Sequence, residues 1–302
     1  MTQHSQNSII SARPAWLLQL ADYWTLTKPE VNSLVLASTL AGYYLAGRGL
    51  SNAWLLFHTL VGTLLVASGT GTLNQYLECA TDARMRRTAK RPLPAGRLAP
   101  AYALGFGILI SIVGGAELWI AANPLASALA LGTLASYLGF YTPLKRLTPF
   151  CTLVGAVPGA MPPLIGWAAV RGSVSGEAWV LAGILFLWQF PHLLAIAWMY
   201  REDYARAGLQ MLPRHDPEGR LMVRQVLGCT LALVPLSLVP VFTGNAGALY
   251  LTGAAILGGA FLYYGLRLAR TRSNVFARQL LFASIAYLPL VLALLMFDRR
   301  PL

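Results

Sequence analysis

Apolar runs long enough to cross a bilayer recur along the whole of this 302-residue chain, and they constrain its fold more than any other feature. Hydrocarbon offers no partner to a free backbone N–H or C=O, so each run must be helical, whereas barrel strands would be about half as long and alternating. Charged residues make up only 11% of the chain, against about 25% in soluble domains. The sequence therefore predicts an all-α integral membrane protein with nine transmembrane helices. The nine expected spans are 31–47, 54–77, 101–122, 124–141, 151–170, 178–200, 225–243, 246–267 and 279–297.

The basic residues predict the orientation of this bundle. With the N-terminus inside, nineteen of the 23 Lys and Arg fall on the inner side, and the outer side keeps Arg48, Arg171, Arg299 and Arg300. Because cytoplasmic loops of membrane proteins collect Lys and Arg, we expect the N-terminus inside and the C-terminus outside. The formal charge of +12 then needs no nucleic-acid partner, since such loops meet anionic lipid.

The domain organisation follows from the same pattern. We expect an N-terminal cytoplasmic segment at 1–26 and one nine-helix domain at 27–298, with inner caps at about 78–100 and 201–224. The three cysteines have no short spacing, so they predict neither a disulfide framework nor a zinc site. The first twenty residues hold no long apolar run, and we expect no signal peptide.

The first cap carries the strongest chemical pattern. Asn74, Glu78 and Asp82 are spaced four residues apart, which places them along one helix face at the end of a span. Their oxygens suit a hard cation such as Mg²⁺, which also leaves sites for phosphate. Cations that could hold phosphate oxygens follow directly: Arg84, Arg86, Arg87, Lys90 and Arg91. This is the pairing that a diphosphate site requires, although the arginines alone also fit an ordinary positive-inside loop.

Two further segments carry polar groups at or inside spans. Tyr141, Lys145 and Arg146 could extend a phosphate clamp, or could be an interfacial tyrosine with topology charges. The second segment contains Trp188, Gln189, His192, Glu202 and Asp203. The first three of these could line a cavity, or His192 could be a hydrogen-bonded structural residue. Between the two segments, the span at 151–170 is rich in Pro and Gly, which predicts a kink and either a substrate slot or tight helix packing.

At these residues the chain resembles the UbiA superfamily of intramembrane prenyltransferases, and within it the haem-farnesylating branch. The resemblance covers roughly 22–298, including T-K-P-E-V at 27–31. Its most specific blocks are N-Q-Y-L-E-C-A-T-D-A-R-M-R-R-T-A-K-R-P-L, Y-T-P-L-K-R, G-A-M-P-P-L-I-G-W-A-A-V-R-G, W-Q-F-P-H and D-Y-A-R-A-G-L-Q-M-L-P. The resemblance implies a nine-helix bundle around a central cavity that the polar loops cap on the cytoplasmic side. It also implies transfer of farnesyl from farnesyl diphosphate to a vinyl group of haem b, with addition of water and release of diphosphate.

The resemblance also implies roles for single residues. It makes Asn74, Glu78, Asp82, Tyr141, Lys145 and Asp203 catalytic, with Mg²⁺ held by Glu78, Asp82 and Asp203. It makes Arg87, Lys90, Arg91, Arg146, Trp188, Gln189, His192 and Glu202 substrate-binding. Two departures stand out: position 78 is Glu where many relatives have Asp, and Asp203 is followed four residues later by Ala207 where other branches have a second Asp. The second departure weakens the case for a second Mg²⁺.

Other functions remain compatible with the pattern. A related prenyltransferase could act on a quinone or chlorin acceptor. A transporter would also have buried acids and kinked helices, but its functional charges should lie near the midplane. A haem chaperone would leave the Glu78 and Asp82 pattern without a purpose. Under the haem reading, we expect a multi-pass protein of the cell inner membrane that passes its product to a haem A synthase or to terminal oxidase assembly.

Overall fold

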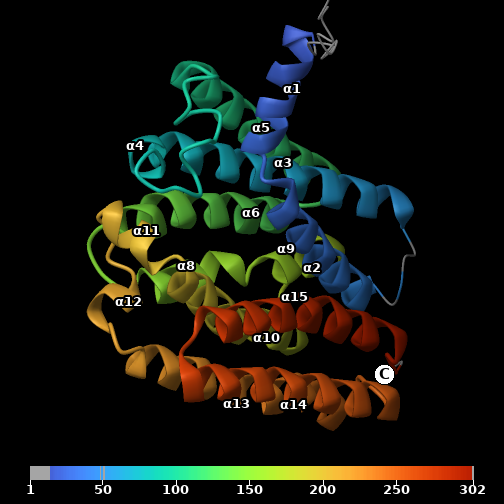
Figure 1. Cartoon of the computed structure of the whole chain (residues 1–302). Helices are drawn as coiled ribbons and strands as arrows, with labels where there is room; N and C mark the ends of the chain where they lie inside the picture. Colours follow the sequence, from blue (N-terminus) through green and yellow to red (C-terminus); the bar gives the residue numbers. More distant parts are fainter. Residues whose placement is uncertain (1–13, 48, 50–51, 301–302) are drawn as a thin grey trace, which may run out of the picture.

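The computed structural model describes residues 14–47, 49 and 52–300, and every element named within them is helical (Figure 1). This confirms the predicted all-α class. The longer helices are α1 (Ala15–Leu26), α2 (Pro29–Gly47), α3 (Ala53–Leu77), α5 (Pro100–Ala121), α6 (Pro124–Ser136), α8 (Cys151–Gly159), α9 (Pro162–Arg171), α10 (Gly176–Met199), α13 (Arg220–Phe242), α14 (Ala248–Thr271) and α15 (Asn274–Phe297). The short ones are α4 (Cys79–Asp82), the π-helix η1 (Tyr137–Tyr141), α7 (Thr142–Leu144), α11 (Arg201–Arg206) and α12 (Leu212–His215). Arg13 and Arg48, both used for the orientation, lie outside the described residues.

Eight spans in the described part of the chain are long and apolar enough to cross a membrane. They match the second to ninth predicted spans, and two of them are composite: α6, η1 and α7 together, and α8 with α9. The first predicted span corresponds to α2, a 19-residue helix that includes Glu30, Asn32, Ser38 and Thr39. These polar residues lower its hydropathy, so the count of nine stays a prediction.

The predicted kink lies between α8 and α9, at Ala160 and Met161. Pro162 and Pro163 cannot continue the hydrogen bonding of α8, and they begin α9 instead. The glycines of this span serve close packing: a Cβ on Gly166 would lie 2.0 Å from the Thr39 carbonyl oxygen of α2. The structure thus decides for tight helix packing at Gly166.

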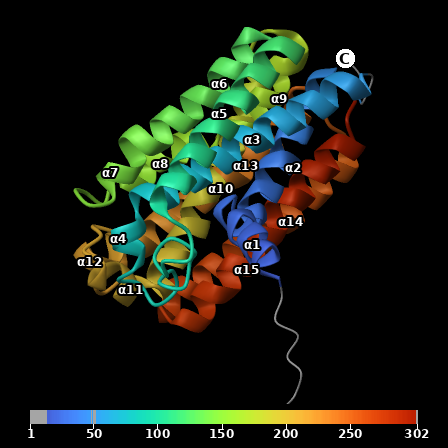
Figure 2. The same cartoon turned by 90° about the horizontal axis from the view of Figure 1, so that it is seen from above.

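The polar segments gather at one end of the bundle. Figure 2 shows α4, α7, α11 and α12 together at one end, with the C-terminus at the opposite end. Both predicted caps, around α4 and around α11 and α12, therefore lie on the same side. That side is the predicted inner one, and its identity as cytoplasmic stays a prediction.

Candidate active site

The site begins where α3 ends. Asn74 lies in the last turn of α3, and Glu78 is the junction between α3 and α4, with φ of −97° and ψ of 6°. Asn74 Nδ2 donates to Glu78 Oε2 at 3.0 Å, so these two side chains share one face as the spacing predicts. Asp82 belongs to α4, beyond the junction, and its carboxylate pairs with Arg91 at 2.7 Å. The predicted continuous face therefore covers Asn74 and Glu78, and the helix breaks before Asp82.

The second predicted loop brings a cation to Glu78. Lys145 Nζ donates to Glu78 Oε1 at 2.9 Å and to Oε2 at 3.1 Å, and both side chains are about one-tenth exposed, 12% and 11%. The ammonium also lies 4.4 Å from the centroid of the Tyr141 ring. Burial alone lowers the pKa of Lys145, but Tyr141, Tyr137 and Glu78 outweigh it and raise this pKa well above its usual value. The ion pair with Glu78 and the face of the Tyr141 ring thus favour the charged form of Lys145.

The backbone around Tyr141 is unusual for a membrane helix. η1 interrupts the α-helical pattern at Tyr137–Tyr141, directly before Lys145 and Arg146. Such π-helical turns often occur at functional sites. Arg146 donates from Nη2 to Thr81 Oγ1 of α4 at 2.6 Å. The residues after η1 and α7 thus contact the α3–α4 junction at Glu78 and the helix α4 at Thr81.

Lys28 completes the cluster, and sequence analysis assigns it no role beyond topology. Its backbone has φ of +52°, in the left-handed region that residues other than glycine rarely adopt. The side chain passes Gly71 of α3, and its Nζ donates to Asn74 Oδ1 at 2.8 Å. Burial, together with the nearby Arg91 and Lys145, lowers the pKa of Lys28 to about 7. The only sequence signal was a lysine directly before a span, in the T-K-P-E-V block.

Asp203 joins the two caps. Its Oδ2 accepts from the backbone N–H of Arg87 at 3.3 Å, and its Oδ1 accepts from Arg206 Nη1 at 2.9 Å. The Arg87 guanidinium lies 4.9 Å from the ring centroid of Tyr200 and 3.4 Å from the hydroxyl of Tyr204. The two caps are therefore in direct contact, through residues 116 apart in the sequence.

Four predicted substrate-binding residues are exposed: Arg87, Lys90, Arg146 and Glu202. Arg87 and Arg146 still contact the caps, through Tyr204 and Thr81. Asp82 and Asp203, by contrast, are buried. The structure brings neither Lys90 nor Glu202 into the buried cluster of Lys28, Asn74 and Glu78.

The residues predicted to line the acceptor side form a separate group on α10. Trp188 stacks on His192 with ring centroids 4.9 Å apart, and its Nε1 donates to the Ser284 carbonyl of α15 at 2.8 Å. His192 Nδ1 lies 2.8 Å from Ser284 Oγ. Gln189 Nε2 donates to the Ala156 carbonyl of α8 at 3.1 Å. These bonds hold the group between α8, α10 and α15, and no described contact joins it to Glu78.

The donor set fits a magnesium ion that shares its ligands with a substrate. Asn74, Glu78, Asp82 and Asp203 present only oxygen ligands, and all four are buried at the same end of the bundle. Among the described residues, no three acidic, His or Cys side chains are close enough to hold a metal by themselves. Mg²⁺ commonly uses one or two carboxylates and completes its shell with water and phosphate oxygens. The single three-carboxylate site of Glu78, Asp82 and Asp203 stays a prediction.

The fold and this cluster are those of an α-helical membrane protein with buried ion pairs at one end of an apolar bundle. Residues 35–294 match the model of the UbiA prenyltransferase family, so the chain belongs to this family. This confirms the predicted class of enzyme, a prenyltransferase. Solved structures agree in fold: a digeranylgeranylglyceryl phosphate synthase superposes with a TM-score of 0.76 at 18% identity, covering 93% of this chain and 98% of that chain. A UbiA homologue from Archaeoglobus fulgidus bound to GPP and Mg²⁺ superposes with a TM-score of 0.63 at 14% identity, covering 91% and 99%.

Sequence relatives are more specific. The chain is 52% identical to the protoheme IX farnesyltransferase of Solibacter usitatus over 290 residues, which is 93% of this chain and 99% of that protein. It is 43% identical to the protoheme IX farnesyltransferase of Koribacter versatilis, over 95% of this chain and 96% of that protein. The similarity therefore runs through both caps and all the helices between them.

Proposed function

We propose that this protein transfers farnesyl from farnesyl diphosphate to a vinyl group of haem b, with addition of water, to give haem O and diphosphate. The observation that carries the proposal is the 52% identity to a protoheme IX farnesyltransferase over nearly the full length of both chains. In the balanced reaction, the C–O bond of the donor breaks as diphosphate leaves, and a C–C bond forms to the vinyl carbon. Water adds to the resulting cation next to the macrocycle and loses a proton.

The departing diphosphate defines the role of the α3–α4 cluster. Each cation of this cluster donates to one oxygen acceptor: Lys28 to Asn74, Arg91 to Asp82, and Lys145 to Glu78. Preorganised cations stabilise the charge that builds on a leaving group. When the donor binds, these three cations would exchange their present acceptors for phosphate oxygens. When bound, Mg²⁺ neutralises phosphate charge further. Glu78, Asp82 and Asp203, with Asn74, would hold it.

The Asp203 contacts would keep the two caps closed over the donor. Arg87, whose backbone binds Asp203, lies with Arg146 near the phosphate end of the site. Tyr141 offers its ring beside Lys145 as a stable wall. A closed, dry site protects an allylic cation from premature water. Lys90 and Glu202, being exposed, would act at most on the approach of the substrates.

The α10 group would serve the acceptor. Trp188 and His192 present stacked rings within the bundle, and Ser284 fixes both. Flat aromatic faces suit a porphyrin, and Gln189 fixes the neighbouring α8. The expected functional unit is then 27–298, in the cell inner membrane with the N-terminus inside. Its product would pass to a haem A synthase or to terminal oxidase assembly.

The direct test is mass spectrometry of haem extracted after incubating the purified protein with haem b, farnesyl diphosphate and Mg²⁺, with EDTA as control. A Mg²⁺-dependent product heavier by one farnesyl and one hydroxyl group supports the proposal. Folded protein that leaves haem unmodified, yet prenylates a quinone-type acceptor, refutes the haem assignment. His192→Ala should lower haem affinity more than affinity for the donor.

A further inference from the structure

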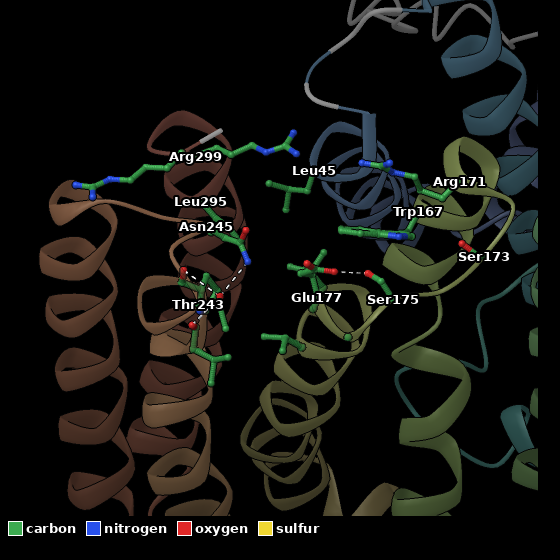
Figure 3. Close-up of a pocket in the computed structure, with 16 residues that line it drawn as sticks. Leu45, Trp167, Arg171, Ser173, Ser175, Glu177, Thr243, Asn245, Leu295 and Arg299 are labelled. Atoms are coloured by element: carbon green, nitrogen blue, oxygen red, sulfur yellow. Dashed lines mark hydrogen bonds between the residues drawn. The ribbon is translucent and has the colours of Figure 1, made fainter. Parts of the chain in front are cut away.

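A second cavity lies at the end of the bundle opposite the α3–α4 cluster. It encloses about 610 Å³ among the ends of α2, α9, α10, α13 and α15 (Figure 3). This volume is within the usual range of small-molecule sites. No step of the proposed reaction uses it.

Three arginines are among the residues that line this cavity. They are Arg171, Arg299 and Arg300, three of the four basic residues that sequence analysis places on the outer side. Because basic residues are depleted on that side, their convergence on one cavity calls for a local reason. Arg171 Nε donates to the Ala46 carbonyl at 2.8 Å, and Arg299 Nη1 donates to the Tyr44 carbonyl at 3.0 Å. Both therefore support the C-terminal end of α2, and Arg171 keeps its two Nη groups for an anion.

No carboxylate of the described residues lies within ion-pair distance of Arg171. The one acid of the cavity, Glu177, accepts a hydrogen bond from the Ser175 hydroxyl (Figure 3). The charged residues at the rim of the cavity thus include a cation for an anion, Arg171, and a carboxylate that can accept a hydrogen bond, Glu177. Such a pair matches a zwitterionic head group.

The wall beneath the rim is apolar. It contains Leu45, Val180, Leu181, Val239 and Leu295. Trp167 also lines the cavity and is only 7% exposed. The cavity therefore suits a molecule with an anionic head and an apolar body.

We propose that this cavity binds a phospholipid of the leaflet opposite the active site, one whose phosphate is followed by a hydrogen-bond donor, such as phosphatidylethanolamine. The phosphate binds the two Nη groups of Arg171, and the ammonium binds Glu177. Lipid phosphates lie at the depth where membrane helices end, which is where this cavity lies. A haem fits less well, because no lining residue is a His, Cys, Met or Tyr that could ligate its iron. This inference is independent of the proposed reaction.

The test is native mass spectrometry of the full chain released from nanodiscs that contain equal amounts of phosphatidylethanolamine and phosphatidylcholine with matched acyl chains. We expect retained phosphatidylethanolamine to exceed phosphatidylcholine about tenfold, since only the former can donate to Glu177. Glu177→Gln should remove most of this preference while lipid is still retained. Water-soluble glycerophosphoethanolamine should not compete, because it lacks the apolar body.

Matched variants separate binding from folding. Arg171→Gln should lower lipid retention several-fold without changing turnover, because it lies at the opposite end from the reaction. Arg278→Gln, an exposed cation at the other end of α15, is the control and should retain lipid like the wild type. The double variant Arg171→Gln/Glu177→Gln should retain almost none. Equal retention by wild type and Arg171→Gln, no preference between the two lipids, or retention of haem in their place would overturn the proposal.

Discussion

Replacing Glu78 tests whether its ion pair with Lys145 serves only the stability of the fold or also prenyl transfer. In Glu78→Gln the side chain keeps its shape, but Lys145 loses the carboxylate that accepts its two hydrogen bonds of 2.9 and 3.1 Å. Breaking a buried ion pair by removing one partner costs about 3–5 kcal/mol. Lys145 retains the face of Tyr141 at 4.4 Å, so we expect the lower end of this range, about 3 kcal/mol.

The second variant tests the origin of that loss. In Glu78→Gln/Lys145→Met neither partner is charged, and a neutral replacement of both members of a buried pair is often tolerated. We therefore expect stability to recover to within about 1 kcal/mol of the wild type. Prenyl transfer should stay at least about 100-fold below the wild type in both variants, because the leaving diphosphate has lost its electrostatic support.

The assays are urea or thermal unfolding in detergent, and the rate of product formation from farnesyl diphosphate. Glu218→Gln is the matched control, because its ion pair with Arg220 at 2.6 Å is largely exposed and should contribute less than about 1 kcal/mol. Recovery of both stability and turnover in the double variant would show that the Glu78–Lys145 pair is only structural, and would refute the assignment of Glu78.

Three further changes test other parts of the structure. Lys28 has a folded-state pKa of about 7, below its value in the unfolded chain, so the charged ammonium opposes folding at low pH. The stability of the wild type should therefore rise from pH 7 towards pH 10, by at most about 1.4 kcal/mol per pH unit. In thermal unfolding, Lys28→Met should flatten this rise. Gly166→Val should destabilise the protein by about 3 kcal/mol or more, because its Cβ would meet the Thr39 carbonyl, whereas Gly105→Ala, with open space around it, should not destabilise it. Asp203→Asn weakens the hydrogen bonds that connect the two caps, and it should raise the KM for farnesyl diphosphate roughly tenfold with little loss of stability. An unchanged KM would show that Asp203 is not part of the site.

The sequence alone determined the features that depend on local periodicity and on solvent. Length and apolarity of the runs fix helices in hydrocarbon, and eight of the nine predicted spans are present as such. Helical spacing places Asn74 beside Glu78 without knowledge of the fold. The proline pair at the start of α9 likewise predicts a break, because proline lacks the N–H that a continuous helix needs.

Only the tertiary structure decided which groups meet. Lys145 and Glu78 are 67 residues apart, and Asp203 and Arg87 are 116 apart, so no local pattern could select these pairs from the many cations and acids at the same end of the bundle. The role of Lys28 depends on a left-handed backbone conformation that lysine does not favour by itself, and which the surrounding contacts impose. Local propensity and hydrophobicity set where each helix lies along the chain. The close packing of α2, α3 and the loop after η1 sets which charges share a site, because it brings together side chains that are distant in sequence.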